Sequence, residues 1–135
     1  MKIDTVKEIE LILSDYFQKG SSQDIEGLLL WQDKLSIHSY RLAQLTADSK
    51  NVYNGNYFIR KITVNKQQQS MIATRKISKA QANLEADVLS EDLFKNELES
   101  EGLTYKYEML LNQVNKILSA MQQRISYLKT EKNQK

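Results

Sequence analysis

Cysteine and proline are both absent from this chain of 135 residues, and each absence narrows what the protein is. Without cysteine there is no disulfide framework, no thiolate nucleophile and no thiolate metal site, which suits a reducing compartment. Without proline the strongest helix breaker is missing. The N-terminus is charged where a signal peptide would be apolar, and the longest aliphatic run is Leu28 to Trp31. We therefore expect a cytoplasmic protein with no membrane partner.

Residues that carry common catalytic chemistry are also scarce. There is one histidine, His38, and the sequence has no glycine-rich phosphate loop and none of the His-Glu spacings that hold zinc or a di-iron centre. His38 lies on an amphipathic stretch without a sequence-evident partner, which is more typical of a structural histidine than of a proton donor. Trp31 is on the apolar stripe of the same stretch and is expected in the core. We predict a protein that is not an enzyme and has no cofactor and no metal site.

The composition is that of long helices, with 27% charged residues and only four glycines. The length is that of one ordinary domain. We predict a single all-α domain in which long amphipathic helices form an elongated bundle or a coiled-coil-like assembly. Its expected parts are an N-terminal helix over residues 1–20, a long central helical region over 21–101, a break at Gly102 and a C-terminal heptad helix over 103–131.

Local signals mark the first helix ends. Thr5 and Glu8 have the spacing of a capping box, and Gly20 has the place of the residue that follows a helix C-terminus. The second helix is expected to begin at Ser21 or Ser22.

The dipeptide Asn54-Gly55 interrupts the central region. It is a common hairpin turn, and residues 57–64 are rich in aromatic and β-branched side chains, so a short pair of strands is one alternative. In the other alternative the helix passes through or bends at Gly55, because Val52 and Ile59 keep the seven-residue phase begun at Leu28. The sequence leaves open whether there is a break near 54–56.

The last segment has the clearest periodicity. From Tyr107 to Leu128, apolar residues alternate steps of four and three. A helix this long encloses little core on its own, so it either folds back as an antiparallel bundle or shares its apolar seam with other chains. We predict a homo-oligomer held by the seam residues Leu111, Val114, Leu118, Met121, Ile125 and Leu128.

Charge is divided unevenly along the chain, although the formal net charge is only +2. Residues 49–84, the basic block, hold seven Lys or Arg and no Asp or Glu. Residues 85–101, the acidic block, hold seven acids against Lys95 alone. Like charges concentrated over tens of residues attract polyanions or bring two chains together in a fixed register.

Aromatic residues adjoin the cations of the basic block. This mixture is typical of proteins that bind single-stranded nucleic acid, because cations contact the phosphates and ring faces stack on the bases. The predicted nucleic-acid-binding residues are Arg60, Lys61, Lys66, Arg75, Lys76, Lys79, Tyr53, Tyr57 and Phe58. The alternative is that the aromatics belong to the core and that the cations pair with the acidic block of the same or a neighbouring chain.

A family resemblance bears on this choice. The aromatic-glycine element Tyr53-Asn54-Gly55 beside a basic stretch, together with a last helix that runs from Leu110 to Ile125, resembles the phage UvsY-type recombination mediators. The resemblance implies ring-like oligomers formed through helices, single-stranded DNA bound by Lys and Arg, and assistance to a recombinase that replaces the single-strand-binding protein. It carries over Arg60 and Lys61 as DNA contacts. In the family the basic residues lie mainly before this element, whereas here they follow it.

We therefore predict a non-enzymatic accessory protein of DNA metabolism that self-associates and binds single-stranded DNA or RNA, with a recombinase or another protein as a further partner. The alternative is a structural or adaptor coiled-coil protein, such as a small phage or bacterial assembly factor. In that case the charge blocks mediate contacts between proteins.

Overall fold

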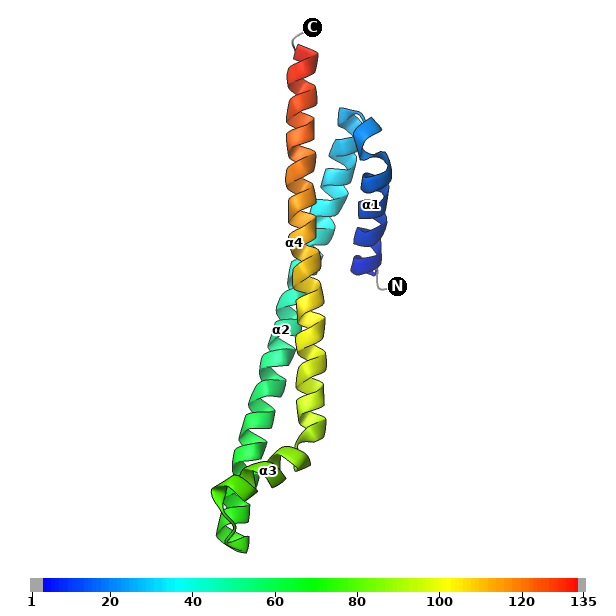
Figure 1. Cartoon of the computed structure of the whole chain (residues 1–135). Coiled ribbons are helices and arrows are strands. Elements are labelled where there is room, and N and C mark those ends of the chain that lie inside the picture. Colours follow the sequence, from blue (N-terminus) through cyan, green and yellow to red (C-terminus); the bar gives the residue numbers. More distant parts are fainter. Residues whose placement is uncertain (1–3, 134–135) are drawn as a thin grey trace. The chain divides into compact units, whose positions relative to one another are not determined.

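The computed structural model describes residues 4–133, and these form helices without any strand (Figure 1). The all-α prediction is confirmed. The elements in chain order are α1 (Thr5–Lys19), a short 3₁₀ turn (Gly20–Ser22), α2 (Ile25–Arg75), α3 (Lys79–Leu89) and α4 (Glu91–Asn133).

Contacts divide the chain into two compact units. The described residues of 1–46 and 107–135 form one, here called the terminal unit, and residues 47–106 form the other, the hairpin unit. Helices α2 and α4 contribute to both. The prediction that the chain folds as a single domain stays a prediction.

The terminal unit consists of α1, the first part of α2 and the last part of α4, packed around one apolar core (Figure 1). The core explains the stripes read from the sequence, because each helix turns its apolar residues toward the other two. Trp31 is partly buried against this core and meets Tyr16 edge to face at a centroid distance of 6.1 Å. The fully buried members of the core are Ile9, Leu35, Leu42, Val114 and Met121.

The first helix is capped one residue before the predicted cap, and α2 begins three or four residues after its predicted start. Asp4, rather than Thr5, caps α1, since its carboxylate accepts from the backbone N–H of Lys7 at 3.2 Å. Asp24 does the same for α2 by accepting from Gly27 at 2.8 Å, so this helix begins after the two serines. A carboxylate in these positions also complements the helix dipole.

Gly20 ends α1 as expected, but in the right-handed conformation, with φ −59°. A Cβ at this position would lie 3.1 Å from the ring of Tyr16. Close packing on this ring, rather than a left-handed turn, is what favours glycine here.

Helix α2 passes straight through Asn54-Gly55, so the hairpin alternative is wrong and the helical one is correct. Gly55 is exposed and a Cβ there would meet no atom within 4 Å. An exposed glycine in a helix costs only about 1 kcal/mol. The contacts that α2 makes with α4 on both sides of Gly55 outweigh this cost.

The predicted break at Gly102 is also wrong, because α4 continues through this residue. The chain instead reverses at residues 76–78, inside the central region expected to be helical. Lys76 has φ 54°, a left-handed conformation that stops α2, and the Ser78 side chain then caps α3 by accepting from Gln81 at 3.2 Å.

Candidate functional site

Helices α2 and α4 run side by side in the hairpin unit (Figure 1), and polar side chains form a seam between them. As residue numbers rise along α2, the numbers of the partner residues fall, as expected for antiparallel helices. Three of the partners are on α4 and the fourth, Ser90, is the residue before it. Burial of polar side chains costs free energy unless they are hydrogen-bonded, and here they bond to one another. The contacts are Ser49 to Thr104 at 2.7 Å, Asn56 to Ser100 at 3.1 Å, Arg60 to Glu97, and Ser90 to Gln67 at 3.0 Å.

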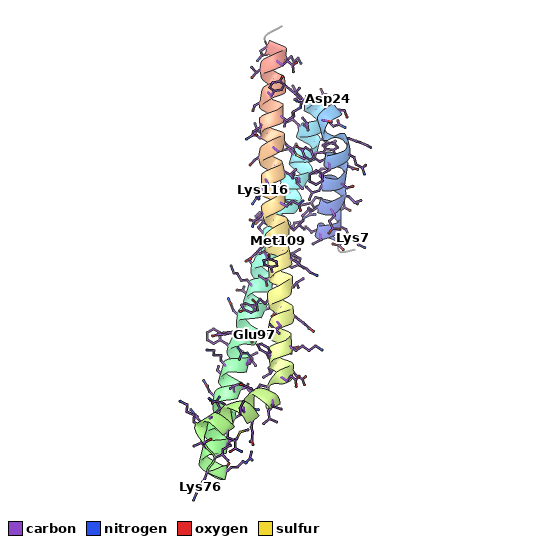
Figure 2. All side chains as sticks on the ribbon, in the orientation of Figure 1. Lys7, Asp24, Lys76, Glu97, Met109 and Lys116 are labelled. Atoms are coloured by element: carbon purple, nitrogen blue, oxygen red, sulfur yellow. The ribbon has the colours of Figure 1, made fainter. Side chains whose placement is uncertain are left out.

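The ion pair of Arg60 and Glu97 is the strongest contact of the seam. The guanidinium donates from Nε and Nη2 to the two carboxylate oxygens, the second contact being 3.3 Å long. Glu97, labelled in Figure 2, has a side chain only 6% exposed, against 22% for Arg60. The hydrogen bond to Glu97 raises the pKa of Arg60 above its ordinary value. A carboxylate this buried needs its cation, so Arg60 has a structural role.

A second ion pair joins the two charge blocks near the chain reversal. Arg75 at the end of α2 donates to both oxygens of Glu85 on α3. These side chains are 54% and 32% exposed, so the pair adds little stability. Both pairs correspond to the predicted alternative in which cations of the basic block pair with acids of the same chain. A nucleic-acid contact by either arginine stays a prediction.

The remaining predicted cations are exposed. Lys61 lies over the ring of Tyr57, with 5.2 Å from Nζ to the ring centroid. Lys66, Lys76 and Lys79 form no ion pair with any residue of the described range 4–133. In Figure 2 the Lys76 side chain points away from the helices at the turn between α2 and α3.

The three predicted aromatics differ in exposure. Tyr53 and Tyr57 are half-buried at the edge of the seam, and the guanidinium of Arg60 lies 5.7 Å from the centroid of the Tyr57 ring. Partial burial, helped by the carboxylates of Glu101 and Glu97, raises the pKa of Tyr53 above 10.0. Phe58 is 63% exposed. It is therefore not a core residue of the chain itself.

The hairpin unit is apolar on its outside. Four residues of α2 are between 51% and 63% exposed and share one side of the helix, here called the α2 outer face: Val52, Phe58, Ile59 and Ile62. On α4, a set of residues that are between 46% and 61% exposed shares one side of the helix and is here called the α4 outer face: Phe94, Leu98 and Tyr105. Most of the buried side chains of this unit are thus polar, while these large apolar side chains are exposed.

Sequence reasoning did not find these two faces as surfaces. The spacing of Val52, Ile59 and Ile62 is regular, but an apolar stripe on a helix is read as core unless the other side is known to be buried. The buried side here is polar and has a weaker sequence signal.

The predicted oligomerisation residues lie in the terminal unit. Val114, Met121 and Ile125 are fully buried, whereas Leu111, Leu118 and Leu128 are half-buried. Val114 and Met121 contact α1 and α2 of the same chain in the core, and Leu111 and Leu118 pack against it. These apolar contacts are therefore made within the chain, and a role in joining copies stays a prediction.

Residues 4–133 contain no group of three or more His, Asp or Glu side chains suited to a metal ion. None of the described helices has the length and apolar character needed to span a bilayer. His38 is half-buried on α2, and its Nδ1 has no hydrogen-bond partner. Comparison of the chain with protein-family profiles, curated proteins and solved structures finds no match.

Proposed function

We propose that this protein is a non-enzymatic assembly protein whose hairpin unit binds other protein surfaces, in the first place other copies of the chain. This is the structural or adaptor function considered from the sequence. The observation that supports it is the hairpin unit, which has a hydrogen-bonded polar seam inside, while the seven large apolar side chains of its two outer faces are about half exposed.

The physical argument rests on the cost of leaving those faces in water. Burial of apolar surface is worth roughly 25 cal/mol per Å², and contiguous exposed apolar patches on soluble proteins mark interaction sites. The chain cannot bury these faces by turning them toward the seam, because that would break the ion pair of Arg60 and Glu97. A partner surface removes them from water without disturbing the seam.

Sedimentation velocity of the full chain over a wide concentration range tests this function. We expect a mass that rises with concentration above the 15.7 kDa of one chain. The double variant Ile59→Asp/Ile62→Asp should lower the association, because it puts charges into the α2 outer face. A single species of 15.7 kDa at every concentration would contradict the proposal.

A second candidate is binding of single-stranded nucleic acid, as in a recombination mediator. The observations that favour it are the exposure of Phe58 and the exposed cations Lys66, Lys76 and Lys79, which form no ion pair among residues 4–133. A gel shift with a labelled oligonucleotide at two salt concentrations tests it. Changing the three lysines to Ala should weaken binding and flatten its salt dependence, because phosphate contacts release counterions. No shift at low salt for the intact protein would exclude it.

A further inference from the structure

The two outer faces of the hairpin unit carry opposite charge. Lys66 follows Ile62 by four residues and so continues the α2 outer face, and Lys61 lies beside it. The whole of residues 49–84 contains no acid that would offset these cations.

The α4 outer face is flanked by carboxylates. Glu101 stands three residues after Leu98 and four before Tyr105, so it lies on the same side of α4. Glu91 is also exposed, three residues before Phe94. Each face also carries one exposed charge of the other sign, because Asp48 is four residues before Val52 and Lys95 is three residues before Leu98. The excess charge is still positive along the α2 outer face and negative along the α4 outer face.

We propose that copies of the chain associate head to tail, with the α2 outer face of one copy packed on the α4 outer face of the next. This inference rests on the proposed self-association and names the surfaces that meet. Apolar side chains then cover one another, while Lys61 and Lys66 face carboxylates such as Glu101.

Pairing of like faces is the competing arrangement, and the charges disfavour it. Two α2 outer faces would bring lysines together, and two α4 outer faces would bring glutamates together. Like charges placed against each other at an interface cost free energy and set specificity against the wrong partner. A contact between unlike faces also leaves one free face on each copy, so that a third copy can add.

Mixing two face-blocked variants tests this arrangement. Ile62→Asp blocks the α2 outer face and leaves the α4 outer face intact, and Leu98→Asp does the reverse. Both side chains are about half exposed, 51% and 50%, so each variant should keep the circular dichroism and melting temperature of the natural chain. We expect each variant alone to sediment as one chain, and an equimolar mixture to form a dimer with one intact contact.

The mixture should stop at two chains, because its remaining contact would place two new carboxylates against each other. Leu103→Asp is the matched control. Leu103 is on α4 with a similar exposure of 46%, but lies five residues after Leu98 on another side of the helix. This variant should associate like the natural chain.

Four outcomes would overturn the inference. A single variant that dimerises alone through its intact face would mean that like faces pair, and a mixture that stays monomeric while the natural chain associates would exclude a contact between the two unlike faces. A single variant that sediments with the same mass as the natural chain would show that its substituted face is not part of the interface. A natural chain that is itself monomeric would refute the proposed self-association, and the head-to-tail contact with it, so the two failures are distinguishable.

Discussion

Replacing Arg60 with methionine should destabilise the hairpin unit by about 3 kcal/mol. The substitution leaves the Glu97 carboxylate without its cation, and that side chain is only 6% exposed. Removal of one partner of a buried ion pair costs about 3–5 kcal/mol, and the partial exposure of Arg60, 22%, places this pair at the lower end of that range. Methionine keeps much of the aliphatic stem but removes the guanidinium, which lies 5.7 Å and 5.3 Å from the ring centroids of Tyr57 and Phe94.

Urea unfolding followed by circular dichroism measures the loss, at one fixed protein concentration because association shifts apparent stability. Lys61→Met is the matched control. Lys61 is the next residue and also a cation of the basic block, but it is exposed and its contact with the Tyr57 ring is worth about 0.5–1 kcal/mol. The control should therefore lose much less than Arg60→Met.

The double variant Arg60→Met/Glu97→Met separates the ion pair from packing. Replacing both partners of a buried pair by apolar side chains is often neutral or stabilising, so the double variant should recover most of the lost stability. The structural role of Arg60 would be refuted by an Arg60→Met variant as stable as the natural chain. It would also be refuted by a double variant that loses as much as the two single variants added together.

Three further predictions concern single residues. Gly102→Ala should stabilise the protein by about 0.5–1 kcal/mol in thermal unfolding, because the glycine is inside a helix, is exposed, and a Cβ there would have no atom within 4 Å. A lower stability of this variant would instead support the helix break at Gly102 that the sequence predicts. Leu118→Asp should destabilise the terminal unit by several kcal/mol in the same measurement, since a charge would enter the edge of its core; unchanged stability would place Leu118 outside that core. The pKa of Tyr53 is raised in the folded state, so its contribution to the free energy of unfolding is complete below pH 10.0 and is lost as the pH rises further. In urea unfolding, the Tyr53→Phe variant should therefore lose less stability at alkaline pH than the natural chain. Equal losses would contradict the raised pKa.

The sequence predicts the helices well because composition and periodicity act locally. The stripe from Tyr107 to Leu128 is helical and faces a core, as its steps of four and three indicate. The helix breaks are less predictable. Gly55 and Gly102 mark none, since one exposed glycine costs little in a helix that packs on both sides of it. The actual reversal at Lys76 involves neither glycine nor proline and has no clear sequence signal.

The site is only partly visible in the sequence. The two charge blocks are plain, and their pairing within one chain is one of the two alternatives that they suggest. The partner of each cation depends on topology, because Arg60 and Glu97 are 37 residues apart and meet only when the chain reverses. The same reversal decides that Ser49 and Asn56 are inside and Ile59 outside. Periodicity alone cannot assign these sides, because it does not say which face of a helix another helix covers.

Cross-linking between single cysteines tests most directly whether other copies cover the two outer faces. The natural chain has no cysteine, so Ile62→Cys and Leu98→Cys each introduce the only thiol. With a short bis-maleimide we predict cross-linked dimers when the two variants are mixed, and few when either is treated alone. Cross-linking within each variant alone, or none in a mixture that sediments as an oligomer, would contradict the account.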